Sequence, residues 1–269
     1  MVQIMSTIPR QFMLVIPSNL DESEKLPVLF IWHWLGGDSS SVMERGFVQA
    51  SVDELRFIAV VPDAKEGSNL FRWPYSAADT QAAVDEELLF FDDMLSCVSQ
   101  QFNVNKECVS TGGASAGALW SAQLAGLRGQ YIANFISLSG GVGGVIKPFP
   151  VPEHKMPALV LWGGPTDSCF GLVDFTSTSQ ALEDDLTAGG HFFVECIHNC
   201  GHGMPPLDSE AMNPLLPVWR FALQHPYWLG AGQSPYVDSG LPADLPPWCG
   251  VSKGSATIRE GECPSPPEC

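Results

Sequence analysis

The chain has 269 residues, of which 45% are hydrophobic, and a formal net charge of −17. This length is enough to bury the core of one α/β domain. The acidic charge argues against nucleic acid and anionic membranes as partners and favours either neutral substrates or life in salty surroundings. No run of about 18 apolar residues occurs, so we expect no membrane-spanning helix.

Apolar runs alternate with segments of helical spacing along most of the chain. We expect strands at residues 11–17, 27–32, 57–61, 132–138, 157–162 and 191–197, and a further strand that ends near Ser110. We expect helices at residues 41–55, 82–101, 176–188 and 214–224, and another that begins at Ala116. Strands separated by helices predict a mostly parallel sheet covered on both faces, with ligands beyond the carboxyl ends of the strands.

The most informative motif lies at one of these strand ends. Residues 113–117 read Gly-Ala-Ser-Ala-Gly between the strand that ends near Ser110 and the helix that begins at Ala116. This is the G-x-S-x-G pattern of a nucleophile elbow, in which a sharp turn exposes the serine hydroxyl. Gly113 and Gly117 leave room for neighbouring backbone, so the pattern predicts Ser115 as a nucleophile.

A serine nucleophile needs a histidine base and a carboxylate that orients the base. Asp167 follows the strand at 157–162 after a Gly-Gly-Pro-Thr turn, and Asp174 is the reserve candidate. Two histidines follow the strand at 191–197. We prefer His202 to His198, because His202 lies between two glycines further along the loop. The order serine, aspartate, histidine is that of the α/β-hydrolase fold.

The stretch that contains both histidines also admits a metal-site interpretation, because residues 196–202 read Cys-Ile-His-Asn-Cys-Gly-His. Cysteine and histidine are common zinc ligands. However, no second cluster completes a tetrahedral set, so we assign no metal and expect these cysteines to form disulfides.

The cysteine content suggests an oxidising compartment. Eight cysteines are many for a cytosolic enzyme, and none of them has paired C-x-x-C spacing; they are Cys97, Cys108, Cys169, Cys196, Cys200, Cys249, Cys263 and Cys269. We expect mostly disulfides, with Cys97 and Cys108 as a plausible local pair, and therefore a secreted or periplasmic protein. The first residues lack the pattern of a secretory signal, so a signal is either absent or already removed.

The remaining parts of an active site are backbone donors and a substrate-binding surface. Acyl transfer needs two N–H donors for the developing oxyanion, one of them from the residue after the nucleophile, here Ala116. Residues 33–37, His-Trp-Leu-Gly-Gly, place Leu35 as the second donor. The long loop at residues 64–80 contains Trp73 and Tyr75, which are candidates either for a pocket wall or for packing at the edge of the core.

These motifs together resemble the secreted esterases of the polyhydroxybutyrate depolymerase and feruloyl esterase group, which are α/β-hydrolases. The resemblance extends from about Gln11 to Cys249 and rests on HWLGG, VVPDA, NVNKECVSTGGASAGA, LWGGPTD and GHFFVECIHNCGHGMP. It implies that Ser115, Asp167 and His202 form the triad and that Leu35 and Ala116 form the oxyanion hole. Trp34 and Ala118 stand where the family usually has glycine, and we expect Trp34 to narrow the cleft.

The resemblance implies hydrolysis of a carboxylic ester through an acyl-enzyme, without a cofactor. Trp34, Trp73 and Tyr75 are the expected substrate contacts. Short-chain polyesters or hydroxyalkanoate esters rank first as substrates, and feruloyl or acetyl esters of plant polysaccharide such as acetylxylan rank second. A serine peptidase and a non-catalytic binding module of the same fold are less favoured alternatives. We expect a monomer.

We expect one catalytic domain at residues 1–229. Residues 230–269, here called the tail, are rich in proline, glycine and serine and contain Cys249, Cys263 and Cys269. Because the tail shows no periodicity, we expect an irregular segment that disulfides attach to the catalytic domain rather than a second domain. The alternative is that this proline- and cysteine-rich tail is the remainder of a linker to a further module.

Overall fold

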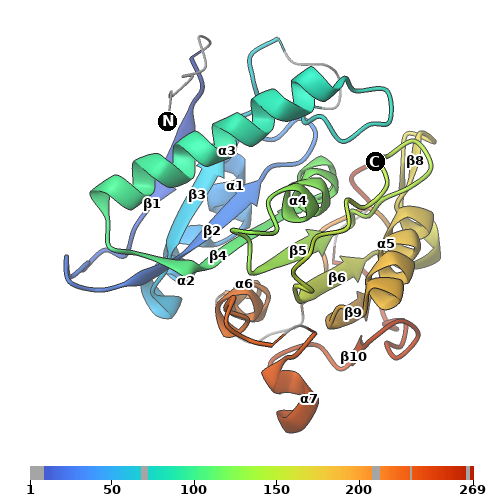
Figure 1. The fold of residues 1–269 in the computed structure, drawn as a ribbon. Coiled ribbons are helices and arrows are strands. Elements are labelled where there is room, and N and C mark those ends of the chain that lie inside the picture. The colour runs from blue at the N-terminus through green and yellow to red at the C-terminus, as the bar shows by residue number, and fades with distance from the viewer. Residues whose placement is uncertain (1–8, 68–71, 208–212, 231, 265–266) are drawn as a thin grey trace.

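The computed structural model describes residues 9–67, 72–207, 213–230, 232–264 and 267–269, and its central feature is a mostly parallel sheet (Figure 1). Within these residues the sheet has eight strands in the order β1-β3-β2-β4-β5-β6-β9-β10. They are β1 (Phe12–Val15), β2 (Leu26–Trp32), β3 (Ile58–Pro62), β4 (Val104–Ala114), β5 (Asn134–Leu138), β6 (Ala158–Trp162), β9 (Phe193–Ile197) and β10 (Cys249–Val251). Only the two edge strands, β1 and β10, pair antiparallel with their neighbours.

Helices cover both faces of this sheet. They are α1 (Ser39–Arg45), α2 (Val48–Leu55), α3 (Gln81–Gln101), α4 (Ala116–Leu127), α5 (Phe175–Gly189), α6 (Leu216–Gln224) and α7 (Pro235–Ser239). A short hairpin, β7 (Ser168–Cys169) and β8 (Val173–Asp174), lies between a 3₁₀ turn (Gly164–Thr166) and α5. This layered architecture is the α/β-hydrolase fold that the sequence predicts.

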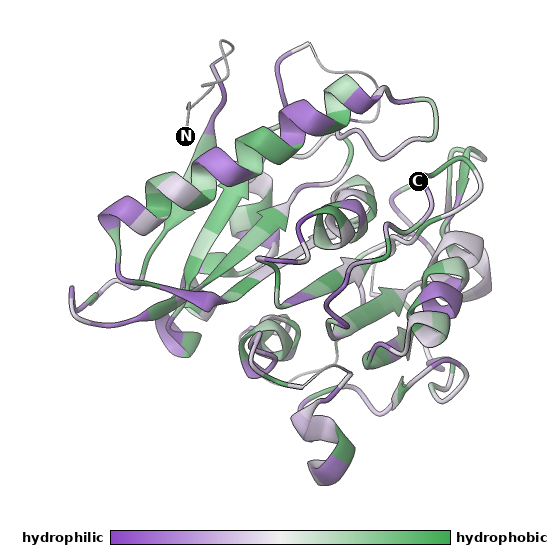
Figure 2. Ribbon diagram, viewed as in Figure 1, coloured by the Kyte–Doolittle hydropathy of each residue, from purple (hydrophilic) through white to green (hydrophobic). Residues whose placement is uncertain are grey.

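The alternation of side chains along the strands explains the two layers. In β2, Val28, Phe30 and Trp32 belong to one hydrophobic cluster with residues of α3, α4 and α5. Leu29 and Ile31 belong to a second cluster with residues of α1, α2 and α6. Both faces of the central strands are therefore buried, which is why these strands read as unbroken apolar runs. The hydropathy colouring shows mostly green strands in the sheet, whereas green, pale and purple residues alternate along helices such as α3 (Figure 2).

The helix predicted over residues 41–55 is two helices in the structure. Its break falls at Gly46 and Phe47, and Phe47 has a left-handed φ of 49°. A Cβ on Gly46 would lie 2.5 Å from the carbonyl oxygen of Val42, so the close approach at this turn requires glycine. The hydrophobic spacing continues through the break, which explains why the sequence pattern does not reveal it.

The tail is more regular than the sequence suggests. It contains α7 and β10, and β10 pairs with β9 as the last strand of the sheet. Three disulfides attach the tail to the rest of the chain, Cys196–Cys249, Cys200–Cys263 and Cys169–Cys269. The expectation that disulfides hold the tail is confirmed, whereas the expectation of an irregular segment is wrong for α7 and β10.

The predicted disulfide between Cys97 and Cys108 is also wrong, because both residues are free thiols. Cys97 is exposed on α3, whereas Cys108 is buried in β4. Their proximity in sequence reflects only the short connection between the helix and the strand.

In the described part of the chain, no helix combines the length and the apolar character needed to cross a membrane.

Candidate active site

Ser115 lies at the junction of β4 and α4, at the carboxyl edge of the sheet. Its backbone has φ 53° and ψ −121°, a conformation that non-glycine residues rarely adopt. The Ser115 N–H donates to the carbonyl oxygen of Leu138 at the end of β5, at 2.9 Å, which ties the strained turn to the next strand. Strain of this kind persists where surrounding structure fixes it, and it is typical of functional sites.

The two flanking glycines allow this turn, as the motif predicts. A Cβ on Gly117 would lie 2.0 Å from the carbonyl oxygen of Trp32, and one on Gly113 would lie 2.6 Å from the same oxygen. The end of β2 therefore passes directly against the elbow. This contact brings the loop after Trp32, which contains Leu35, to the nucleophile.

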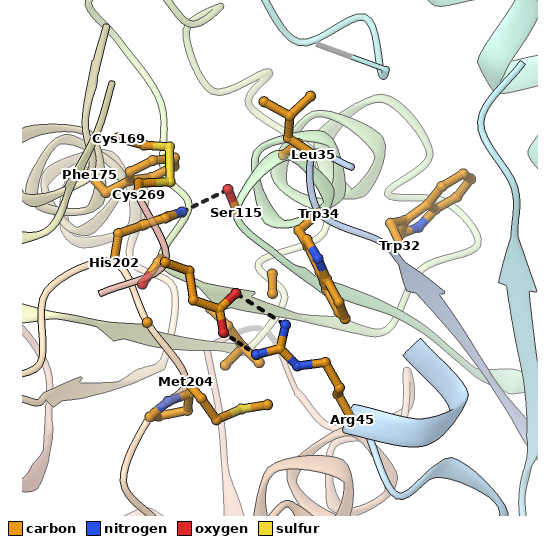
Figure 3. Close-up of a pocket in the computed structure, with 18 of the residues that line it drawn as sticks. Trp32, Trp34, Leu35, Arg45, Ser115, Cys169, Phe175, His202, Met204 and Cys269 are labelled. Carbon is orange, nitrogen blue, oxygen red and sulfur yellow. Dashed lines mark hydrogen bonds and ion pairs between the residues drawn. A yellow bond between two sulfur atoms is a disulfide. The ribbon is translucent and has the colours of Figure 1, made fainter. Parts of the chain in front are cut away.

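Three side chains from distant parts of the chain meet at the elbow. The Oγ of Ser115 lies 2.8 Å from His202 Nε2, a contact marked by a dashed line in Figure 3. On the other side of the imidazole, His202 Nδ1 lies 2.7 Å from Asp167 Oδ1. Because a carboxylate only accepts, Nδ1 carries the proton, and Nε2 is left to accept from the serine hydroxyl. The structure thus brings together the three residues that the sequence predicts as the triad.

Local packing fixes the acid and the base. Asp167 is fully buried, and its Oδ2 accepts from the N–H of Gly163 at 2.7 Å. A Cβ on Gly163 would lie 1.9 Å from the carbonyl oxygen of Gly201, so the loops that carry Asp167 and His202 touch through their backbones. The imidazole of His202 stacks on Phe175, with ring centroids 4.1 Å apart. These contacts restrict the imidazole to the orientation that faces Ser115.

The reserve candidates have other roles in the structure. Asp174 caps α5, where its carboxylate accepts from the backbone N–H and the hydroxyl of Ser177. His198 is fully buried, its Nδ1 accepts from the N–H of Cys200, and burial lowers its pKa to about 4. Neither residue is hydrogen-bonded to Ser115, so the geometry favours Asp167 and His202.

The two predicted oxyanion donors flank Ser115. Ala116 is the first residue of α4, so no carbonyl one helical turn earlier accepts its N–H. Leu35 belongs to the loop after β2, and both residues line the same pocket as Ser115. Ala116 and Leu35 therefore both lie shortly after strands of the sheet, β4 and β2, which hold them next to Ser115.

His33 holds the loop that carries Leu35. Its Nδ1–H donates to the carbonyl oxygen of Trp34 at 2.7 Å, and its Nε2 accepts from the N–H of Ala64 at 3.1 Å. These two contacts require a neutral imidazole, and burial favours that form because it lowers the pKa of His33. The indole N–H of Trp73 donates to the carbonyl oxygen of His33 at 3.0 Å.

The candidate site opens into a pocket of about 300 Å³. Most of its lining is apolar and comes from strand ends, from the β7–β8 hairpin and from α6. The lining includes Trp34, Leu35, Arg45, Tyr75, Ser115, His202, Glu268 and Cys269. This volume is at the lower end of the range for small-molecule sites, so the enclosed part holds a small group.

The three aromatic residues predicted to contact substrate differ in their positions. Trp34 lines the pocket, and so does Tyr75, although Tyr75 is only 3% exposed. Trp73 is fully buried and does not line the pocket, so its predicted contact with substrate is wrong. Its ring instead packs in the core against Trp32, and its indole N–H supports the loop that carries Leu35 by donating to the carbonyl oxygen of His33.

The sequence did not indicate several residues around the pocket. Phe175, which stacks on His202, begins a helix and belongs to no motif. Arg45 at the end of α1 forms an ion pair with Glu268 from the tail, and its guanidinium lies 5.0 Å from the centroid of the Trp34 ring. The Glu268 contact depends on how the tail folds back, and disulfide connectivity cannot be read from sequence.

The cysteines near the histidines are used in disulfides. Cys196 and Cys200 pair with residues of the tail. Cys169, His202 and Cys269 have potential ligand atoms within 4.8 Å of one another, but Cys169 and Cys269 are bonded to each other. A disulfide sulfur is not the thiolate that zinc prefers, so this group does not form a metal site in its oxidised state.

Comparison with known proteins identifies the fold. No family model matches the sequence, and no curated protein is significantly similar to it. Among solved structures, native pOPH aligns over 93% of this chain and 92% of its own, with 16% identity and a TM-score of 0.71. A ferulic acid esterase aligns over 72% of this chain and 85% of its own, with 16% identity and a TM-score of 0.55. A phospholipase/carboxylesterase from Dyadobacter fermentans aligns over 81% of this chain and 99% of its own, with 18% identity and a TM-score of 0.54. At these identities the likeness shows the fold, which is that of the α/β-hydrolases.

Proposed function

We propose that this protein is a serine esterase that hydrolyses carboxylic esters through an acyl-enzyme. The observation that carries the proposal is the continuous hydrogen-bonded series from Ser115 through His202 to Asp167, with distances of 2.8 and 2.7 Å. This arrangement is the one that activates a serine hydroxyl near neutral pH. The esterases among the structures of the same fold support the same interpretation.

In the proposed reaction, Ser115 Oγ attacks the ester carbonyl while its proton moves to His202 Nε2. The N–H groups of Leu35 and Ala116 stabilise the oxyanion, and Asp167 stabilises the imidazolium. His202 then protonates the departing alcohol, which leaves an acyl group on Ser115. Water, deprotonated by the same imidazole, attacks the acyl carbonyl. The bond to Ser115 Oγ then breaks, the imidazolium returns its proton to that oxygen, and the acid is released. The catalytic groups in this cycle are side chains and backbone of this chain, and water is the second substrate.

The first substrate class that we propose is a short-chain polyester or hydroxyalkanoate ester, as in polyhydroxybutyrate depolymerases. The pocket holds only about 300 Å³ and its lining is mostly apolar. It therefore suits a small, neutral acyl or hydroxyacyl unit. The acidic surface of the chain agrees with a neutral rather than an anionic substrate.

The second candidate is a feruloyl or acetyl ester of plant polysaccharide. The indole of Trp34 lines the pocket and offers an aromatic surface on which an aryl group would stack. A ferulic acid esterase is also among the proteins of the same fold.

We further propose that the protein works outside the cytoplasm, because three disulfides join the tail to the catalytic part.

A panel of esters tests the proposed function. The substrates are p-nitrophenyl acetate, p-nitrophenyl butyrate, methyl ferulate and emulsified polyhydroxybutyrate, each assayed with the native protein and with Ser115→Ala. We expect turnover of the short esters by the native protein and its loss in the variant. Preference between methyl ferulate and polyhydroxybutyrate then distinguishes the two substrate classes.

Unchanged hydrolysis by Ser115→Ala would contradict the mechanism. Absence of turnover on every ester by the correctly folded native protein would favour a non-catalytic binding module, and cleavage of peptides but not esters would favour a peptidase.

A further inference from the structure

One wall of the pocket comes from residues far away in sequence. Glu268 and Cys269 line the pocket together with Arg45 and Trp34, which follow the early strand β2 and belong to the opposite side of the site. In the close-up view, Cys269 lies beside His202, and Arg45 and Trp34 lie across the pocket from it (Figure 3). We call residues 267–269 the closing segment.

Two contacts attach the closing segment to the side that carries the catalytic candidates. The N–H of Glu268 donates to the carbonyl oxygen of His202 at 2.8 Å. Cys269 is bonded to Cys169, which lies two residues after Asp167 in the β7–β8 hairpin. A covalent bond and a backbone hydrogen bond therefore place this segment directly against the acid and histidine loops.

A third contact joins the closing segment to the opposite side. The carboxylate of Glu268 forms a bidentate ion pair with the guanidinium of Arg45, in which Nη1 and Oε2 are 3.1 Å apart. The guanidinium also lies over the ring of Trp34. The Arg45–Glu268 pair thus connects the two sides of the pocket. Dashed lines mark the contacts of the Arg45 guanidinium in Figure 3.

The strengths of these contacts differ. The side chains of Arg45 and Glu268 are 37% and 40% exposed, so their ion pair is screened by salt and contributes little to the stability of the fold. The disulfide keeps one end of the segment in place when the ion pair opens. The pair also compensates the charge of Arg45 within a mostly apolar lining, which keeps that side of the pocket neutral.

We infer that the Arg45–Glu268 ion pair and the Cys169–Cys269 disulfide determine which esters enter the site, by holding the closing segment as a pocket wall against large acyl chains. This inference rests on the proposed esterase function and adds a selection device to it. Opening the ion pair lets the segment move away from Trp34 and lengthens the accessible pocket. Releasing the disulfide as well removes the wall.

The test compares kcat/KM for p-nitrophenyl octanoate with that for p-nitrophenyl acetate. The variants are Glu268→Gln and Cys169→Ser/Cys269→Ser, and the matched control is Asp244→Asn, which breaks the exposed Arg220–Asp244 ion pair elsewhere on the surface. We expect the octanoate-to-acetate ratio to rise by about tenfold in Glu268→Gln, since changes of pocket fit by a methylene or so have effects of this order. The ratio should rise further in the cysteine variant and stay unchanged in the control.

Ionic strength supplies a readout that a purely structural role would not change. In the native protein the octanoate-to-acetate ratio should rise with added salt as the ion pair is screened, whereas Glu268→Gln should show a weaker dependence. Thermal unfolding of each variant checks that it is folded. Glu268→Gln keeps the test decisive if the cysteine variant does not fold.

Two failures remain distinguishable. If the native protein turns over neither ester, the proposed function fails and this inference fails with it. If the native protein is an esterase but Glu268→Gln and the cysteine variant keep the native ratio within about twofold at all salt concentrations, only the selection device is refuted.

Discussion

Ser115 has a backbone conformation that only its surroundings make possible. The carbonyl oxygen of Trp32 lies so close to Gly113 and Gly117 that a Cβ at either position would collide with it. The sequence alone indicates these glycines because the chemistry of the turn requires them. In the same way, the order of Ser115, Asp167 and His202 is readable from the motifs that follow each strand.

The residues that sequence reasoning missed or misplaced act through contacts that leave no pattern. Trp73 belongs to an aromatic loop that suggests a pocket wall. In the structure, however, its indole N–H donates a hydrogen bond to the carbonyl oxygen of His33. Phe175 supports the imidazole of His202 by stacking. In the sequence, Phe175 looks like any aromatic residue at the start of a helix, so nothing indicates this role. To assign such a residue to the pocket or to the core, one must know where its side chain points. In a loop, the spacing of apolar residues in the sequence does not give that direction.

The two candidate acids offer a direct comparison. In Asp167→Asn, His202 loses the acceptor that fixes its tautomer, so we expect kcat on p-nitrophenyl acetate to fall by about 10⁴-fold. In Asp174→Asn, only the cap of α5 changes, which affects stability by about 1 kcal/mol or less and leaves turnover close to native. Steady-state kinetics on both variants measure the difference. An inactive Asp174→Asn variant with an active Asp167→Asn variant would reverse the assignment.

At the scale of elements, the central strands are predictable because burial on both faces makes them continuous apolar runs. The last strand, β10, escapes prediction because it has only three residues, Cys249–Val251, and its position depends on pairing with β9. The disulfide between Cys196 and Cys249 joins a directly paired position of these two strands. Strand pairing between distant segments therefore determines which cysteines are bonded to each other, and the sequence does not specify this pairing.

The free cysteines differ in their accessibility to a thiol reagent. Cys97 is exposed on α3, whereas Cys108 is buried in β4, where burial raises its pKa to about 11. Without reductant, we expect rapid labelling of Cys97 in the native protein and labelling of Cys108 only after unfolding. Peptide mapping after alkylation identifies the modified residues. Labelling of any of the other six cysteines before reduction would contradict the three disulfides.

At the scale of the whole molecule, one buried group makes the stability depend on pH. Glu183 on α5 is fully buried, and its Oε1 accepts from the indole N–H of Trp162 at 2.9 Å. Burial, and then the neighbouring Glu195 carboxylate on β9, raise the pKa of Glu183 to about 8. The native state therefore keeps this proton over a pH range in which the unfolded chain has lost it.

The sign of this effect follows from proton linkage. Between about pH 4.5 and about pH 8, the native state binds more protons at Glu183 than the unfolded state, so the free energy of unfolding decreases as pH rises. A glutamine at this position keeps the acceptor for Trp162 and does not titrate. We therefore expect Glu183→Gln to gain stability relative to the native protein as pH rises through this range.

Urea unfolding at several pH values measures this difference. Glu66→Gln, at an exposed position, is the control. Its free energy of unfolding should follow the same pH dependence as that of the native protein. A difference between Glu183→Gln and native that stays constant from pH 4.5 to 8 would show that Glu183 is ionised in the fold.

The proposed active site works only if Ser115 is an activated nucleophile. The most direct measurement is reaction with a serine-reactive phosphonate, followed by intact mass and peptide mapping. We expect one adduct, on Ser115, which is absent in Ser115→Ala and forms far more slowly in His202→Ala, because the base is hydrogen-bonded to Ser115 Oγ. Failure of the folded native protein to form this adduct, or an adduct at another serine while Ser115→Ala still hydrolyses esters, would contradict the proposed site.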